Sequence, residues 1–198
     1  MTAAVQSIGT GLVIGLLGQK QSGKDSFAKY LTEDHAFMRH AYADAMKDSL
    51  YALDPYVFGA NERLSIITKR MGWDRAKEQY PEVRRLLQRF GTEVGRDILG
   101  EDIWTQIMAT KLERARKAGA NVVVTDVRFL NEASLITAHG GILVRVDRPG
   151  LPDEDQHRSE QEWREIKPFA TITNSGTLED LRQTCGAFMS ELKERGVA

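Results

Sequence analysis

The segment LVIGLLGQKQSGKDSFAKY, from Leu12 to Tyr30, constrains the fold more than any other part of this chain. An apolar run is followed by Gly18, four further residues, Gly23 and Lys24, and then by a helical pattern. Glycines at both ends let the backbone turn tightly, so that its N–H groups and the positive end of the next helix face a polyphosphate. The spacing predicts a strand, a phosphate-binding loop (P-loop) and a helix, with Lys24 reaching the β- and γ-phosphates. The alternative is a Gly- and Ser-rich turn without a ligand.

The loop departs from the common P-loop consensus at Asp25, where most P-loops have a serine or threonine whose hydroxyl binds Mg²⁺. A carboxylate is a hard ligand that suits Mg²⁺, and it is also favoured in the first turn of a helix. Asp25 is therefore predicted to hold the metal, directly or through water, with helix capping as the alternative. Lys20 adds a second positive charge, which would offset Asp25 when a nucleoside triphosphate is bound.

A second polar cluster follows the β-branched run at Val122–Val124. Asp126 is expected at the carboxyl end of a buried parallel strand, the edge at which α/β sheets bind ligands. If the strand extends to Arg128, the two side chains point the same way, with Asp126 placed for Mg²⁺ or water and Arg128 for a phosphate. A local Asp–Arg ion pair is the alternative. Asn131 and Glu132 are predicted mainly as residues that start a helix.

Short β-rich runs alternate with helical patterns, which predicts a three-layer α/β domain with a parallel sheet of about five strands. The strand candidates are 12–17, 37–42, 122–124, 142–146 and 170–173. Between Ala43 and Gly119 no strand is predicted, and the helical patterns cover 43–53, 61–71, 81–99 and 101–118. We therefore predict one domain over 1–198, with a helical insert over about 43–119 that binds an acceptor substrate.

Composition excludes several classes of protein. With 198 residues, 41% of them hydrophobic and 28% charged, the chain can bury a core. A net charge of −1 predicts no broad attraction to nucleic acid or to an anionic membrane. Cys185 is the single cysteine, which excludes an internal disulfide and suits a buried thiol in a reducing cytoplasm. The start of the chain lacks a basic signal-peptide region, and no apolar run reaches the length of a membrane span.

A third polar stretch, RVDRPGLPDEDQHRSEQEW, runs from Arg145 to Trp163. Prolines and a glycine at 149–152 break regular structure, and a helix is predicted to resume near Ser159. A basic flap of this kind can close over a transferring phosphoryl group and exclude water, so we predict a lid over about 148–165. A charged loop that is merely solvated is the alternative.

The loop from Gly18 to Asp25, with its two lysines and its aspartate, resembles that of bacteriophage deoxynucleoside monophosphate kinases. It also resembles the loop of animal-type phosphomevalonate kinases. The resemblance extends through ADAMK at 43–47, LQRFGTEVGR at 87–96, DVRFLNE at 126–132, DQHRSE at 155–160 and TNSGTL at 173–178. The segment 87–104 favours the deoxynucleotide enzymes. The resemblance implies a P-loop kinase fold, ATP with Mg²⁺ as donor, and a deoxynucleoside 5′-monophosphate as acceptor.

Carried over to the matching positions, the resemblance implies four sets of site residues. The ATP site would comprise Gly18, Gln19, Lys20, Gln21, Ser22, Gly23, Lys24, Asp25, Ser26, Arg148, Asn174, Gly176 and Thr177. Catalysis would fall to Lys20, Lys24, Asp126 and Arg128, and the metal to Asp25 and Asp126. The acceptor site would comprise Asp44, Lys47, Gln88, Arg89, Thr92, Arg96, Trp104, Arg128 and Glu132. The lid would carry Arg148, His157, Arg158 and Glu160.

Several of these residues have a structural alternative. Trp104 can be a core residue instead of a stacking platform, and Arg89 and Arg96, two helical turns apart, can lie on a solvated helix face. The segment 174–177 can be a strand-to-helix turn in which Thr177 is the N-cap, instead of a loop that lines adenine.

Three functions remain open from the sequence. The first is a deoxynucleoside monophosphate kinase, the second a phosphomevalonate or other small-metabolite kinase, and the third a nucleotide-binding regulatory ATPase. The expected partners are small-molecule nucleotides, with no nucleic acid and no membrane, and a homodimer is compatible with the sequence. The expected location is the cytoplasm, which is the host's if the source is viral.

Overall fold

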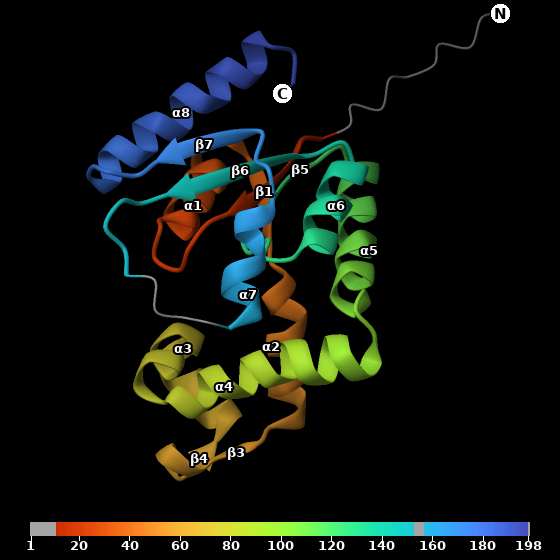
Figure 1. The fold of residues 1–198 in the computed structure, drawn as a ribbon, viewed down its shortest axis with the longest axis vertical. Helices are drawn as coiled ribbons and strands as arrows, with labels where there is room; N and C mark the ends of the chain where they lie inside the picture. The colour runs from red at the N-terminus through yellow and green to blue at the C-terminus, as the bar shows by residue number, and fades with distance from the viewer. Residues whose placement is uncertain (1–10, 153–156, 198) are drawn as a thin grey trace, which may run out of the picture. The chain divides into compact units, whose positions relative to one another are not determined.

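The structure is a computed structural model of the chain that describes residues 11–152 and 157–197. The chain divides into two compact units, Met1–Ala41 with Met108–Ala198, and Tyr42–Ile107. A five-stranded parallel sheet organises the first unit (Figure 1). In spatial order its strands are β2 (Phe37–His40), β5 (Asn121–Val124), β1 (Val13–Leu17), β6 (Ile142–Asp147) and β7 (Ala170–Thr173). The predicted α/β fold with about five parallel strands is confirmed.

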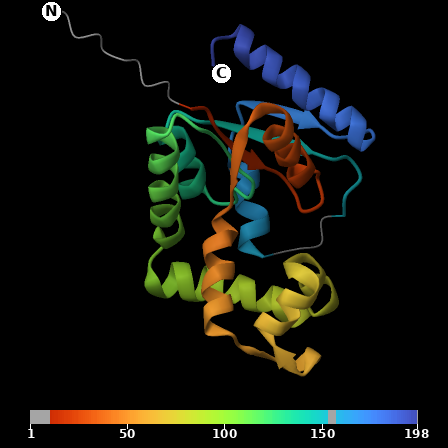
Figure 2. The ribbon, with the colours of Figure 1, turned by 180° about the vertical axis from the view of Figure 1, so that it is seen from behind.

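Strand β1 lies at the centre of the sheet, between β5 and β6. All five of its residues are buried, because helices cover both faces of the sheet. Helices α1 (Lys24–His35) and α8 (Leu178–Glu194) lie on one face (Figure 2). Helix α6 (Leu130–Ala138) and residues 108–117 of α5 (Ile103–Lys117) lie on the other face (Figure 1). The sheet with its two helical layers gives the three-layer order predicted for this fold class.

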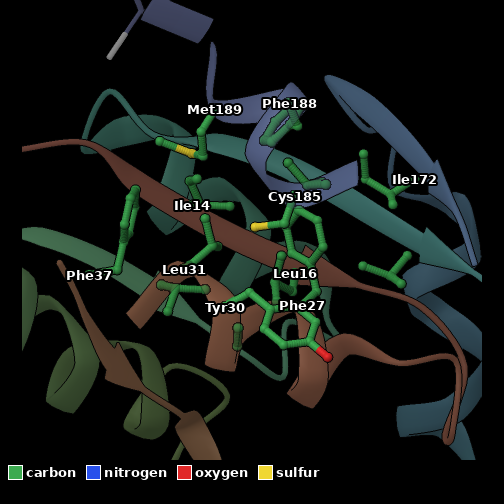
Figure 3. Close-up of a cluster of buried hydrophobic side chains, with 14 of the residues drawn as sticks. Ile14, Leu16, Phe27, Tyr30, Leu31, Phe37, Ile172, Cys185, Phe188 and Met189 are labelled. Carbon is green, nitrogen blue, oxygen red and sulfur yellow. The ribbon is translucent and has the colours of Figure 1, made fainter. Parts of the chain in front are cut away.

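The main hydrophobic core lies between the sheet and the face formed by α1 and α8. Figure 3 shows Ile14 and Leu16 of β1 between Phe27 and Leu31 of α1 and residues of α8. Cys185 of α8 is buried in this core, and burial raises the pKa of its thiol to about 12. The prediction of a buried cysteine in a C-terminal helix is confirmed.

The second unit is mainly helical and has its own core, built on Leu50, Ile67 and Val83. Its elements are α2 (Tyr42–Leu53), β3 (Tyr56–Val57), η1 (Phe58–Ala60), β4 (Glu62–Arg63), α3 (Leu64–Gln79), α4 (Pro81–Arg89), the π-helix η2 (Phe90–Leu99) and the first residues of α5. The helix predicted from 61 begins at Leu64, extends to Gln79 and is kinked at Gly72.

One prediction about strands is wrong, and one predicted strand is shorter than expected. The prediction that no strand lies between 43 and 119 fails because β3 and β4 pair as a short antiparallel hairpin, with Tyr56 opposite Arg63. Strands of two residues have too few positions to produce an alternating pattern. The strand candidate at 37–42 ends at His40, because Tyr42 already begins α2.

Two further elements of the first unit follow the segment that leaves β6. They are helix α7 (Arg158–Gln161) and the 3₁₀-helix η3 (Glu162–Glu165). The helix predicted to resume near Ser159 is therefore present. In the described residues we find no helix with the length and apolar content needed to cross a membrane.

Candidate functional site

The carboxyl ends of the five strands meet at one edge of the sheet, because all five run parallel. The loop that starts at Gly18 follows β1, Asp126 follows β5, Arg148 follows β6 and Asn174 follows β7. In Figure 1 the arrowheads of β6 and β7 point toward the edge where the loop after β1 lies. This edge is the usual ligand site of an open α/β sheet.

The loop from Gly18 to Gly23 has a backbone that only glycine can adopt at its two ends. Gly18 has φ 136° and Gly23 has φ 102°, and a Cβ on Gly18 would lie 2.3 Å from the carbonyl oxygen of Val146. Gly23 is also the N-cap of α1, and no side chain caps the helix there. The N–H groups in the first turn of α1 are therefore left for an anionic ligand.

Lys24 folds back across the loop. Its Nζ donates to the carbonyl oxygens of Gly18 at 2.7 Å and Gln19 at 2.6 Å. Burial, followed by the positive charge of Arg128, lowers the pKa of Lys24 to about 8. A phosphate that took the place of these carbonyls would satisfy the same ammonium and restore its preference for the charged form.

Asp126 and Arg128 lie close to Lys24, although not for the reason expected. Strand β5 ends at Val124, so the two side chains do not share an orientation along a strand. The backbone N–H of Val127 instead donates to Leu16 at 3.2 Å and holds this segment beside β1. The charges of Asp25 and Asp126 both raise the pKa of Lys24, which opposes the effects of burial and Arg128.

The sites proposed for Mg²⁺ contain two carboxylates, Asp25 and Asp126. Within the described ranges there is no group of three or more His, Cys, Asp or Glu side chains able to hold a metal. Mg²⁺ in phosphoryl-transfer enzymes usually takes only one or two carboxylates, together with water and the phosphates. Two carboxylates near the lysine of the loop fit that pattern.

Glu132 acts at the start of α6, as the sequence predicts. Its side chain is 3% exposed, and Oε2 accepts the backbone N–H of Arg128 at 2.7 Å and of Phe129 at 3.2 Å. The carboxylate thereby fixes the backbone that carries the Arg128 side chain.

Asn174 has a role that the sequence analysis missed. Its side chain is 6% exposed, and Nδ2 donates to the carbonyl oxygen of Ser22 at 2.9 Å. The sequence placed Asn174 at the correct edge of the sheet, but no local pattern indicates a partner 152 positions away. Thr177 is the N-cap of α8, which was the structural alternative to a role in lining adenine, and its side chain accepts the N–H of Asp180.

The lid candidates are distributed over two segments of the first unit. Arg148 is exposed just after β6, whereas His157 and Arg158 lie at the start of α7. The Gln19 side-chain amide donates to the carbonyl oxygen of Pro152 and so connects the P-loop to the first of these segments. Residues 153–156, and the side chain of Glu160, lie outside the described part of the structure.

The second of these segments, which contains Arg158, is bound to the start of α6. Arg158 donates to Glu162 at 3.1 Å and lies over the ring of Phe129, while Glu162 accepts the N–H of Leu130 at 3.0 Å. Arg145 donates to the carbonyl oxygen of Ile166 at 2.8 Å, so its guanidinium anchors the end of η3.

In the second unit the two arginines predicted to share a helix face have different environments. Arg89 is exposed and pairs with Glu93 at 2.9 Å, whereas Arg96 is 4% exposed and donates to the carbonyl oxygen of Glu101 at 3.0 Å. The reason is that residues 90–99 form a π-helix, whose i→i+5 hydrogen bonds change the angular spacing of side chains.

Trp104 occupies a packing position in the second unit. The residue is 4% exposed, its indole N–H donates to the carbonyl oxygen of Gly91 at 2.7 Å, and its ring packs against Phe90. This placement favours the core alternative over a stacking platform. The remaining acceptor candidates of this unit, Asp44, Lys47, Gln88 and Thr92, are half-buried.

The loop has glycine at both ends and joins the central strand of a parallel sheet to a helix that no side chain caps. Its lysine lies within electrostatic range of an arginine and two carboxylates. These features define a P-loop phosphate-binding protein. A family model described as deoxynucleotide monophosphate kinase matches residues 64–185. The chain belongs to the deoxynucleotide monophosphate kinase family.

Individual relatives agree with this assignment. A protein of Acanthamoeba polyphaga mimivirus, named as a deoxynucleotide monophosphate kinase, is 34% identical over an alignment of 183 positions, gaps included, that covers 85% of this chain and 91% of the relative. The deoxynucleotide monophosphate kinase of Enterobacteria phage T4 is 23% identical over an alignment of 230 positions, gaps included, that covers 85% of this chain and 95% of the relative.

Solved kinases also resemble the structure. The dephospho-CoA kinase from Campylobacter jejuni has a TM-score of 0.49 at 13% identity, covering 93% of this chain and 98% of that one. The shikimate kinase from Aquifex aeolicus has a TM-score of 0.49 at 13% identity, covering 94% and 100%.

Proposed function

We propose that this chain transfers the γ-phosphoryl group of ATP to a deoxynucleoside 5′-monophosphate, giving ADP and the deoxynucleoside diphosphate. The observation that carries the proposal is the proximity of Arg128 to Lys24 at the end of the P-loop. One cation serves the donor phosphates, and a second lies within electrostatic range of it, which suits transfer between two phosphate groups. Membership of the deoxynucleotide monophosphate kinase family supports the choice of acceptor.

The chemistry requires alignment and neutralisation of charge more than a strong base. A phosphate monoester is already ionised near neutral pH, so an acceptor oxygen can attack the γ-phosphorus directly. The new P–O bond forms as the bond to the β,γ-bridging oxygen breaks, and the electron pair of that bond stays on ADP. Lys24 and Lys20 would withdraw charge from the donor oxygens, while Arg128 would hold the acceptor phosphate through two N–H donors.

Lys24 must change its partners when the donor binds. In this structure its ammonium donates to the carbonyl oxygens of Gly18 and Gln19. We propose that it exchanges these neutral acceptors for the β- and γ-phosphate oxygens, which form stronger, charge-assisted hydrogen bonds. The exposed Arg148 and the segment of Arg158 are proposed to add positive charge and exclude water as a lid.

Mg²⁺ is proposed to bind with ATP, held by Asp25 and Asp126. When bound, the ion would supply positive charge that offsets the negative charge of the phosphates. Each carboxylate lies near enough to Lys24 to raise its pKa. The position of Asp25 in the first turn of α1, next to Lys24 in the sequence, supports this proposal.

The acceptor-binding role of the second unit remains a prediction from the family resemblance. Arg89, Gln88 and Thr92 are its accessible or half-buried candidates, whereas the guanidinium of Arg96 is bound to the carbonyl of Glu101. We further propose that the protein acts on free nucleotides in the cytoplasm. A homodimer would be compatible with this role.

The experiment that tests the function is a screen of acceptors with Mg-ATP. The common ribo- and deoxynucleoside monophosphates and phosphomevalonate are each incubated with the purified protein, and both ADP and the phosphorylated product are separated by chromatography. We expect at least one deoxynucleoside diphosphate, and its loss with Lys24→Ala. Turnover of phosphomevalonate alone, or hydrolysis of ATP that no acceptor changes, would exclude the proposal.

A further inference from the structure

The hydrogen bond between Asn174 and Ser22 joins the loop after β7 to the P-loop. It is buried, it is 2.9 Å long, and it runs from the Asn174 side-chain amide to the Ser22 carbonyl oxygen. We infer that Asn174 is a positioning residue that acts on the bound phosphates through the Ser22–Gly23 peptide and does not contact the nucleotide base. The inference rests on the proposed binding of a polyphosphate by the loop and deepens it.

The geometry of a peptide group explains how such a bond could act. In a trans peptide the C=O and N–H bonds point in opposite directions, and none of the described residues has a cis peptide bond. Because Asn174 holds the carbonyl of Ser22, the N–H of Gly23 points away from Asn174. A donor that is fixed before the ligand arrives loses little entropy when a phosphate oxygen binds it.

Gly23 is required for this close approach. A Cβ on Gly23 would lie 2.4 Å from Nδ2 of Asn174, so any other residue would displace the amide. The φ of 102° at Gly23 also belongs to a region that other residues rarely adopt. The loop and the asparagine are therefore fitted to each other.

Asn174 is itself held in place by its surroundings. Its backbone N–H donates to the carbonyl oxygen of Asp147, the last residue of β6, at 2.6 Å. The chain then enters α8 through Thr177, whose N–H and hydroxyl both donate to Asp180, at 2.8 Å and 2.7 Å. A backbone held before and after Asn174 can present its side chain to the glycine-rich loop in one orientation.

The two roles conceivable for Asn174 have different consequences for ligands. A residue that contacts adenine contributes to the binding of ATP but not to the binding of inorganic tripolyphosphate. A residue that orients the Ser22–Gly23 peptide contributes equally to both, because both place phosphates in the loop. Tripolyphosphate is therefore the probe that separates the two roles.

The test compares Asn174→Asp and Asn174→Ala with the unaltered protein. Asn174→Asp keeps the size of the side chain but removes the donor, and Asn174→Ala removes the donor without adding a charge. We expect each variant to bind ATP and tripolyphosphate about tenfold more weakly, as the loss of one hydrogen bond predicts, when measured by calorimetry. The KM for ATP should rise, whereas the KM for the acceptor stays unchanged.

Asn121→Ala is the control. The side chain of Asn121 also binds the backbone of a distant residue in the same unit, but as an acceptor: it accepts the backbone N–H of Leu12 at 2.8 Å, at the opposite edge of the sheet. We expect this variant to lose stability and to keep both affinities. Three outcomes would overturn the inference. The Asn174 variants could bind ATP more weakly but tripolyphosphate normally, or they could bind both ligands as the unaltered protein does. The third is that Asn121→Ala loses as much affinity as they do.

The binding experiment also separates this inference from the proposed function. One outcome is that tripolyphosphate binds to the unaltered protein and binds more weakly to the Asn174 variants, but no deoxynucleoside monophosphate is phosphorylated. In that case the acceptor assignment fails while the role of Asn174 stands. If the unaltered protein does not bind tripolyphosphate, both fail.

Discussion

The positive charge of Arg128 acts on Lys24 at the end of the P-loop: burial, followed by this charge, lowers the pKa of Lys24 to about 8. The repulsion between the two side chains is offset in part by Asp25 and Asp126. A bound polyphosphate would add negative charge beside Lys24 and so favour the charged form of its ammonium.

The first prediction concerns the pH dependence of phosphate binding. Lys24 of the free protein loses its proton as the pH rises through about 8, and a bound polyphosphate raises its pKa again. Binding above pH 8 must therefore be coupled to the uptake of a proton, and affinity should fall with pH by up to about tenfold per unit. Calorimetry at pH 8.5 in buffers of different ionisation enthalpy measures this uptake. Binding heats that do not depend on the buffer would contradict the prediction.

The second prediction concerns Arg128. Arg128→Gln removes the positive charge that lowers the pKa of Lys24, so the fall in ATP affinity with pH should begin at a higher pH. Because the same guanidinium is proposed to hold the acceptor phosphate, the KM for the acceptor should rise, on the order of tenfold or more. Arg182→Gln is the control, since Arg182 pairs with Asp34 on the surface and should alter neither quantity. An unchanged pH profile in Arg128→Gln would show that the two charges do not interact.

The third prediction concerns the metal. Asp25→Asn keeps the shape of the side chain in the first turn of α1 but removes its charge. If Asp25 helps to bind Mg²⁺, turnover should require a higher Mg²⁺ concentration, while the affinity for ATP without Mg²⁺ changes little. The measurement is a titration of turnover with Mg²⁺, beside ATP binding in the presence of a chelator. Equal losses in both would show that Asp25 acts only through the helix.

The fourth prediction uses Cys185 to report on the stability of the main core. With its pKa raised to about 12 by burial, the thiol should react with an alkylating reagent at pH 8 only when the core opens. Phe27→Ala removes a fully buried ring of the same core and should lower the free energy of unfolding by about 3–5 kcal/mol, with faster labelling of Cys185. Lys29→Ala removes only an exposed ion pair with Glu33 and should leave the labelling rate nearly unchanged.

The sequence predicts the first unit well because its signals are local and strong. The strand expected at 12–17 is β1 at Val13–Leu17, and the helix that follows begins at Lys24, since the loop between them needs glycine at fixed positions. The strands expected at 142–146 and 170–173 are found within one residue of their bounds. Apolar runs bounded by turn residues define such strands without any knowledge of their partners.

The features that the sequence did not predict depend on contacts between distant residues or on unusual backbone geometry. Arg96 is buried and Arg89 is exposed because a π-helix separates them, and the amino-acid pattern of 81–99 is compatible with an ordinary α-helix. The proximity of Arg128 to Lys24 arises from a backbone hydrogen bond after β5 has ended, not from the alternation of a strand. The partner of Asn174 is visible only in the folded chain.

The bond from Asn174 to Ser22 also has a consequence for biosynthesis. Ser22 leaves the ribosome early, whereas Asn174 is translated 152 residues later, after nearly all of the sheet has been made. The segments on either side of the P-loop are therefore synthesised long before Asn174, which we infer to orient the Ser22–Gly23 peptide. The full affinity for nucleotide would then be reached only once Asn174 has been made and has folded against the loop.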